Sequence, residues 1–332
     1  MHNMREKVAW AIAGVLALFV VVSMTGVVSG GPLDPPGAPS STLPQVEPRN
    51  PIPPVGWDGT FPIVISQPGS YFLTRNLTGT PGQDGIDVSA SDVTLDLNGF
   101  LIEGSGPSPG QGIHATVSVT GIVIKDGIIR GWPDFGINLT DATSASVSGV
   151  NVSSNSTGIF LGASSSLTDC TANNNTSDGI LVIGANSSVS RCQANSNGSG
   201  GIRLMAENDL VRESSVSANL VGIELNGTCT GCHVFDNYAS GNHVGIGFNQ
   251  DFVVVEGNTS VGNSTWGFNR FGGGHSVLRS NVARHNGGGG CSGDDCGSSA
   301  DYNRETVTTA PDDWGPIGTA AASTSPFANI AE

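Results

Sequence analysis

Short alternations of apolar and polar residues run along the chain after residue 60, and Gly, Asn and Ser separate them. Alternate residues of a strand point to opposite faces, so this pattern predicts many short strands with one buried face. The pairs expected to point inward include Ile159 and Leu161, Ile180 and Val182, Ile202 and Leu204, and Ile223 and Leu225. No segment after residue 30 carries the apolar stripe of a long amphipathic helix, so we expect an all-β domain.

The strands recur with a fixed period. Nine pairs of a glycine and a following apolar residue lie at intervals of 21 to 27 residues, and such self-similarity is typical of a solenoid. The pairs are Gly85-Ile86, Gly112-Ile113, Gly136-Ile137, Gly158-Ile159, Gly179-Ile180, Gly201-Ile202, Gly222-Ile223, Gly245-Ile246 and Gly267-Phe268.

An asparagine accompanies most of these glycines, three or four positions earlier. The asparagines are Asn155, Asn175, Asn197, Asn219, Asn242 and Asn263. Asn and Gly tolerate left-handed backbone, so we expect each coil to turn here and the stacked amides to form a ladder. Helical and leucine-rich solenoids do not fit these short segments, so the pattern predicts a single-stranded parallel β-helix of about nine or ten coils.

The sequence also resembles a known family. The segments ISQPGSYFLTRNLTG (65–79), GIDVSASDVTLDLNGFLIEG (85–104) and DDWGPIG (312–318), with the Gly-Ile coils, resemble bacterial secreted right-handed parallel β-helix proteins of the pectin-lyase-like superfamily. This resemblance implies the fold over residues 61–318. It indicates little about activity, because the same coil serves lyases, hydrolases and adhesins.

The N-terminal residues predict export, and the composition of the chain predicts its division into segments. Residues 1–30 hold Arg5 and Lys7 before an apolar run at 8–28, which indicates a signal peptide, or a membrane anchor if it is not cleaved. Residues 31–60 are rich in Pro and form the expected linker. The β-helix is assigned to 61–290, and 291–332 to a disulfide-clipped loop and a C-terminal cap. We expect a bacterial, secreted or cell-surface monomer.

The net charge of the chain excludes some classes of binding partner. The chain carries a formal net charge of -15 with 12% charged residues, which argues against nucleic acid and anionic lipid. An acidic polymer would need a local basic patch or a bridging cation.

Six cysteines suit an exported protein. Cys170 and Cys192 occupy the same place in adjacent repeats and are either a disulfide or two small core residues. Cys229 and Cys232 form a CTGC motif for which a local disulfide is favoured over a redox or zinc pair. Cys291 and Cys296 are expected to clip a surface loop.

Candidates for catalysis are few. Two carboxylate pairs, Asp294-Asp295 and Asp312-Asp313, lie outside the central coils, and the resemblance to polygalacturonase-type enzymes fails because their motifs do not occur in order. The nearest analogue of a calcium-dependent pectate lyase site is Asp169, Arg191 and Arg212, for which a structural salt-bridge ladder is favoured. We therefore predict no cofactor and no metal site, with calcium conceivable only if the protein is an enzyme.

One outward stripe offers groups that bind sugars. It lies two residues after each glycine of the repeat and mixes acids, amides and an aromatic ring. The candidate ligand-binding residues are Asp87, His114, Asn138, Phe160, Arg203, Glu224 and Asn269, and a solvated sheet face is the plainer interpretation. The leading hypothesis is a non-catalytic module that binds a glycan or cell-envelope component. The alternatives are a polysaccharide lyase or glycoside hydrolase, and a structural or adhesin-like rod.

Overall fold

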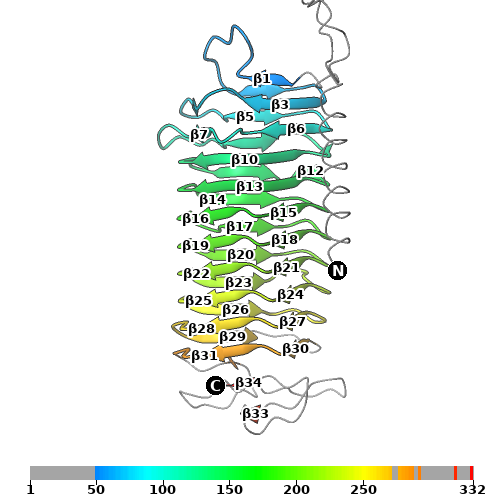
Figure 1. Ribbon diagram of the computed structural model, residues 1–332, viewed down its shortest axis with the longest axis vertical. Coiled ribbons are helices and arrows are strands. Elements are labelled where there is room, and N and C mark those ends of the chain that lie inside the picture. Colours follow the sequence, from blue (N-terminus) through cyan, green and yellow to red (C-terminus); the bar gives the residue numbers. More distant parts are fainter. Residues whose placement is uncertain (1–48, 271–275, 288–290, 293–317, 320–329, 332) are drawn as a thin grey trace, which may run out of the picture. The chain divides into compact units, whose positions relative to one another are not determined.

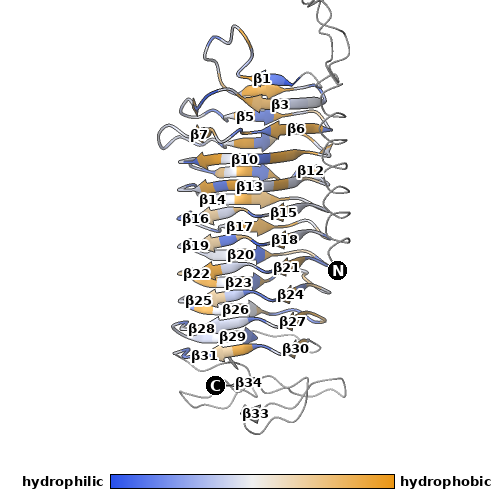
Figure 2. Ribbon diagram, viewed as in Figure 1, coloured by the Kyte–Doolittle hydropathy of each residue, from blue (hydrophilic) through white to orange (hydrophobic). Residues whose placement is uncertain are grey.

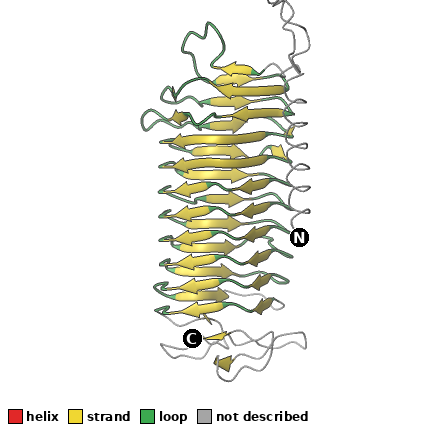
Figure 3. Ribbon diagram, viewed as in Figure 1, coloured by secondary structure: helices red, strands yellow, loops and turns green. Residues whose placement is uncertain are grey.

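The computed structural model describes residues 49–270, 276–287, 291–292, 318–319 and 330–331 (Figure 1). They belong to a compact unit that spans Glu47–Glu332. The signal peptide or anchor at 1–30, most of the linker and most of the C-terminal tail lie outside the described residues, so those expectations stay predictions. Within the described part every regular element is a strand, and no helix there is suited to cross a membrane (Figure 3).

The unit is a parallel β-solenoid of about ten coils, as the repeat predicts. Sheet B, the smaller of its two main sheets, takes one strand from each coil. Its strands are β2 (Ile63–Ile65), β5 (Ile86–Val88), β8 (Ile113–Ala115), β11 (Phe135–Leu139), β14 (Thr157–Leu161), β17 (Ile180–Val182), β20 (Gly200–Leu204), β23 (Val221–Leu225), β26 (Val244–Phe248), β29 (Trp266–Arg270) and β32 (Cys291–Ser292).

Sheet A forms the rest of the wall and takes two strands from most coils. The first set is β1 (Asn50–Ile52), β3 (Gly69–Leu73), β6 (Val93–Asp96), β15 (Ser166–Thr168), β18 (Ser188–Ser190), β21 (Leu210–Arg212), β24 (His233–Phe235), β27 (Val254–Glu256) and β30 (Val277–Arg279). The second set is β4 (Leu77–Thr78), β7 (Leu101–Glu103), β16 (Thr171–Asn173), β19 (Gln193–Asn195), β22 (Ser215–Ser217), β25 (Tyr238–Ser240), β28 (Thr259–Val261), β31 (Val282–Arg284), β33 (Gly318–Thr319) and β34 (Ile330–Ala331).

Two long strands join these sets. Both β10 (Val123–Arg130) and β13 (Ser146–Ser153) pair with strands of the first set at their start and of the second set at their end. Apolar and polar segments alternate along them (Figure 2). A small additional sheet pairs β9 (Val119–Thr120) with β12 (Ala142–Thr143).

The core runs inside the coils. The predicted inward residues are fully buried, as Ile159, Leu161, Ile180 and Val182 show with 0% exposure. The first strand, β1, pairs with β3 although it lies within the predicted linker at 31–60. The solenoid therefore begins before residue 61. It also continues past residue 290, because β32 pairs with β29.

The asparagine ladder is present. Asn155 donates its backbone N–H and its side-chain amide to Asn175 Oδ1, at 3.0 and 3.2 Å, and the same pair of bonds repeats coil by coil. The ladder runs through Asn155, Asn175, Asn197, Asn219, Asn242, Asn263 and Asn286. A second ladder, which the glycine spacing did not reveal, joins Asn237, Asn258 and Asn281.

The repeat glycines and the ladder asparagines do not themselves take the left-handed backbone at these corners. The residue directly before each ladder asparagine does so, for example Ala218 with φ of 55° and Gly241 with 61°. The repeat glycines are required by space instead. A Cβ on Gly222 would lie 2.5 Å from the carbonyl oxygen of Gly245 and 2.9 Å from Asn242 Nδ2. Close stacking of one coil on the next therefore selects glycine.

The cysteines follow the coils. Cys229 and Cys232 form a disulfide, as favoured from the sequence. Cys170 and Cys192 are buried free thiols in this structure, so they fill the core as two small residues. The backbone of Cys291 lies in β32, whereas Cys296 and the carboxylate pairs 294–295 and 312–313 lie outside the described residues.

Candidate functional site

The outward stripe on sheet B is aligned by strand pairing. Asp87 pairs with His114, His114 with Asn138, and Asn138 with Phe160. The register continues through Leu181, Arg203, Glu224, Gly247 and Asn269. We call this set of residues the sheet B row. Each member directly follows a buried apolar residue of its strand, such as Ile113 before His114. Neighbouring residues of a strand point to opposite faces, so the row faces away from the core.

A second row lies beside it, made of the residue that precedes each repeat glycine. Pairing places Phe135 beside Thr157, and the backbone N–H groups of Gly85 and Gly112 donate to the carbonyl oxygens of Gln111 and Phe135. This flanking row contains Asp84, Gln111, Phe135, Thr157, Asp178 and Gly200. Sequence reasoning missed it, although its constant offset of three residues from the sheet B row was available as a signal.

The two rows bring two carboxylates and an imidazole together. His114 Nδ1 lies 2.9 Å from Asp84 Oδ2 and 3.9 Å from Asp87 Oδ1. Asp84 Oδ1 accepts the backbone N–H of Gln111 at 2.8 Å. Asp87 Oδ1 is buried and has no hydrogen-bond partner. Each of the three side chains is 18 to 22% exposed, so the group is half-buried at the surface.

The environment drives the two carboxyl pKa values apart. Burial, followed by the charge of Asp84, raises the pKa of Asp87 to about 6. Burial also disfavours the ionised form of Asp84, but hydrogen bonds from His114 and from the Gln111 N–H outweigh it and lower the pKa of that carboxyl. The hydrogen bond to Asp84 raises the pKa of His114, in spite of partial burial. Charge is therefore concentrated on Asp84 and His114.

Amides continue the site along the rows. Asn138 Nδ2 donates to Gln111 Oε1 at 2.7 Å, and Gln111 Nε2 lies 3.2 Å from His114 Nδ1. Asn138 Oδ1 accepts from both the backbone and the hydroxyl of Thr140. These bonds fix the orientation of the Gln111 and Asn138 amides.

Two phenylalanines follow. The rings of Phe135 and Phe160 stack with a centroid distance of 5.2 Å and an angle of 20° between their planes. Both side chains are partly exposed. The stacked pair presents apolar ring surface next to Asn138, which is the partner of Phe160 in the strand register.

Arg203 and Glu224 form an ion cluster farther along. Arg203 Nε donates to Glu224 Oε2 at 2.7 Å, and its guanidinium lies 3.2 Å from Asp178 Oδ1. The Asp178 side chain is only 3% exposed and also accepts the Gly200 N–H. Arginine and two carboxylates thus converge, but they satisfy one another. Asn269, the last predicted ligand-binding residue, is buried in β29.

The catalytic candidates on sheet A do not form a site. Arg191 makes a bidentate ion pair with Asp169, with bonds of 2.8 and 2.9 Å, and both side chains are exposed. Arg212 does not extend this pair: it lies in β21, one residue before the corner, and bonds to Glu213. Asp169 and Arg191 therefore make one surface ion pair, and Arg212 does not continue it into the ladder expected from the sequence.

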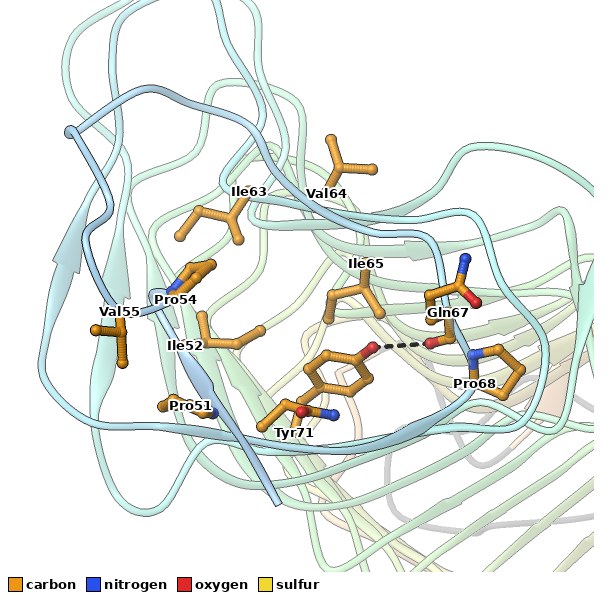
Figure 4. A pocket seen from close by; sticks show the side chains of 11 residues that line it. Pro51, Ile52, Pro54, Val55, Ile63, Val64, Ile65, Gln67, Pro68 and Tyr71 are labelled. Atoms are coloured by element: carbon orange, nitrogen blue, oxygen red, sulfur yellow. Dashed lines mark hydrogen bonds between the residues drawn. The ribbon is translucent and has the colours of Figure 1, made fainter. Parts of the chain in front are cut away.

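An apolar cavity of about 430 Å³ lies beside the first strands (Figure 4). Ile52, Ile65 and Tyr71 line it, and the Tyr71 hydroxyl donates to the Gln67 carbonyl oxygen at 2.9 Å. Val64, also in its lining, pairs with Asp87 at the start of the sheet B row and is 57% exposed. The cavity offers few polar groups, so it does not complete the site.

Comparison with known sequences gives a family match. The model of a family described as a right handed beta helix region matches residues 63–215 and, in a second alignment, residues 135–283. No curated protein matches the chain.

Solved structures share the fold at low identity. A mutant tailspike protein of E. coli bacteriophage HK620, in complex with a pentasaccharide, is 14% identical with a TM-score of 0.59, covering 68% of this chain and 53% of its own. The Dettilon tailspike protein is 14% identical with a TM-score of 0.51, covering 69% and 55%. This chain thus spans about half the length of the tailspike proteins that it matches.

Proposed function

Because this chain belongs to the family of right-handed β-helix proteins, with function carried by side chains on the coils, we propose that it binds a glycan along the two rows of sheet B. The observation that carries the proposal is the Phe135–Phe160 stack, which lies directly beside an ordered group of amides. An apolar ring face next to oriented hydrogen-bonding groups suits a sugar ring, whose faces are apolar and whose edges carry hydroxyls.

The polar groups are spaced for several sugar hydroxyls. Gln111 and Asn138 hold each other in place, His114 lies on the same coil as Gln111, and Asp84 lies on the preceding coil. Strands of a sheet lie about 4.8 Å apart, so the rows from Asp87 to Phe160 span roughly 14 Å. A glycan of a few residues fits along that span. The net charge of -15 favours a neutral glycan over an acidic one.

The fold is used for glycans elsewhere: the HK620 tailspike structure contains a bound pentasaccharide. That likeness supports a glycan as ligand class and leaves its identity open to experiment. Export to the cell surface, which the N-terminal residues predict, agrees with a polysaccharide partner.

A glycoside-processing enzyme is the second candidate, and one observation favours it. The pKa of Asp87 is raised while that of Asp84 is lowered, and such a separation is typical of an acid and a base in one site. However, the reacting oxygens of Asp84, Asp87 and the His114 nitrogen all lie within 4.8 Å of one another. Hydrolases place their two carboxyl groups on either side of the scissile bond, about 5 Å or more apart. Binding is therefore the function that we propose.

The test is retention of the purified full chain on a panel of immobilised neutral and acidic polysaccharides, with assays for new reducing ends and for unsaturated products in the same samples. Retention of one polysaccharide without turnover supports the proposal. Turnover that is lost in Asp87→Asn supports the enzyme. A chain that shows neither retention nor turnover would support the structural rod.

A further inference from the structure

We propose that Asp84, Asp87 and His114 bind one divalent transition-metal ion of the zinc type. The inference does not depend on glycan binding. Sequence analysis predicted no metal site, because Asp84 lies outside the outward stripe and its approach to His114 depends on how one coil stacks on the next.

The ligand atoms already converge. Asp84 Oδ2, Asp87 Oδ1 and His114 Nδ1 lie within 4.8 Å of one another, and the shortest separation, from Nδ1 to Asp84 Oδ2, is 2.9 Å. Zinc bonds to nitrogen and oxygen are about 2.0–2.2 Å long, which places neighbouring ligand atoms roughly 3–3.5 Å apart. A small side-chain rotation of Asp87, whose Oδ1 is 3.9 Å from Nδ1, completes that geometry.

One of these atoms lacks a hydrogen-bond partner. Asp87 Oδ1 is shielded from solvent and accepts no hydrogen bond. A buried carboxylate oxygen without a donor is costly, so native structures usually supply a donor or a cation. A metal ion between the three side chains would satisfy this oxygen directly.

The surroundings fit a metal site. A metal ion that binds His114 Nδ1 displaces the proton from that nitrogen. The two carboxylates and the neutral imidazole then carry two negative charges, which a divalent ion balances. The backbone N–H of Gln111 holds the other oxygen of Asp84 and so directs Oδ2 toward His114. Such bonds to the remaining ligand atoms orient metal ligands in known sites.

The donor set selects the kind of ion. Calcium prefers six to eight oxygen ligands, and this group offers one nitrogen and two carboxylates. Imidazole with carboxylate suits zinc and related first-row ions. With three protein ligands at the surface, a further position stays open to water or to a bound molecule.

Calorimetric titration of the chelator-treated full chain with ZnCl₂, MnCl₂ and CaCl₂ tests the proposal. We expect one zinc ion to bind per chain, with or without glycan. Manganese should bind more weakly than zinc, and calcium should bind least. Absence of zinc binding by the full chain would overturn the site.

Asp87→Asn and His114→Gln provide the residue test, with His243→Gln as a matched control, because His243 hydrogen-bonds Ser264 and Thr265 away from the group. Zinc affinity should fall at least tenfold in both variants of the group and stay unchanged in the control. Zinc binding that both variants retain would place the ion elsewhere and contradict the proposal.

Thermal unfolding separates loss of the site from loss of the fold. Without metal, Asp87→Asn should unfold at or above the temperature of the unsubstituted chain, because it removes a carboxylate whose Oδ1 is shielded from solvent and accepts no hydrogen bond. With zinc, the unsubstituted chain should gain thermal stability and Asp87→Asn should not. An Asp87→Asn variant that gains as much as the unsubstituted chain would refute a role for this carboxylate. Phe160→Ala should keep zinc binding, which distinguishes this proposal from the glycan proposal.

Discussion

Asp84 and His114 are thirty residues apart in sequence, yet Asp84 Oδ2 and His114 Nδ1 lie 2.9 Å apart because consecutive coils stack in register. This contact links the flanking row to the sheet B row and begins the surface that continues through Asn138 to Phe160. The same stacking that forms the core thus assembles the candidate site.

Asp209 should make stability depend on pH. The residue is 1% exposed, Oδ2 has no partner, and burial raises the pKa of its carboxyl from 3.8 to about 7. The folded state therefore holds the proton on Asp209 more tightly. The contribution of this residue to stability is highest at low pH and falls as pH rises from about 4 to 7, by up to ~4 kcal/mol. Asp209→Asn should unfold at a higher temperature than the unsubstituted chain at pH 8, and the difference should shrink at pH 5. An equal difference at both pH values would show that the carboxyl does not titrate as described.

The asparagine ladder should be sensitive to one deletion. Asn219 accepts the backbone and side-chain N–H groups of Asn197 and donates to Asn242 and to the Ala194 carbonyl oxygen. Asn219→Ala leaves buried donors without partners, so we expect a loss of about 2–3 kcal/mol in the free energy of unfolding. Denaturant titration checks this, with the exposed Gln193→Ala on β19 as a control that should change stability by less than ~0.5 kcal/mol. Similar effects of the two variants would argue against the ladder.

Two glycines of one coil should respond differently to alanine. Gly222 has no room for a Cβ, whereas Gly241 has nothing within 4 Å of that position and a φ of +61°. Gly222→Ala should cost roughly 1–3 kcal/mol or more through overpacking, and Gly241→Ala about 1 kcal/mol through backbone strain alone. Equilibrium unfolding of both variants tests this order. The reverse order would mean that left-handed backbone, and not the stacking of coils, selects the repeat glycine.

The Asp169–Arg191 ion pair should not contribute to binding. Its side chains are exposed and lie at the corners between strands of sheet A, away from the two rows. Asp169→Ala should leave glycan retention and the unfolding temperature unchanged within error, since exposed ion pairs contribute little. Loss of retention would move the binding surface to sheet A.

The scaffold was accessible from sequence because one short pattern repeats. The spacing of Gly-Ile pairs fixed the coil, the inward residues such as Ile180, and the row from Asp87 to Asn269, all of which depend on the period alone. The position of the left-handed residue was not accessible, because glycine spacing does not show whether conformation or crowding selects glycine, and Gly222 is selected by crowding.

Only half of the candidate site could be predicted from the sequence. Asp87, His114, Asn138 and Phe160 share one position in the coil, so a periodic pattern revealed them. Asp84 and Gln111 became part of the site through side-chain contacts across the coils, at distances such as 2.9 Å that no spacing specifies. Arg203 likewise was predicted on the surface, but its pairing with the buried Asp178 depends on the flanking row.

The most direct test of glycan binding compares Phe160→Ala with Tyr238→Ala on the polysaccharide that retains the full chain. Both residues are partly exposed aromatics, but Tyr238 is 47% exposed on β25 of sheet A, outside the two rows. Binding titrations should show an affinity about tenfold lower for Phe160→Ala, equivalent to ~1.4 kcal/mol, and an unchanged affinity for Tyr238→Ala. Unchanged affinity in Phe160→Ala, or an equal loss in both variants, would contradict binding along the sheet B row.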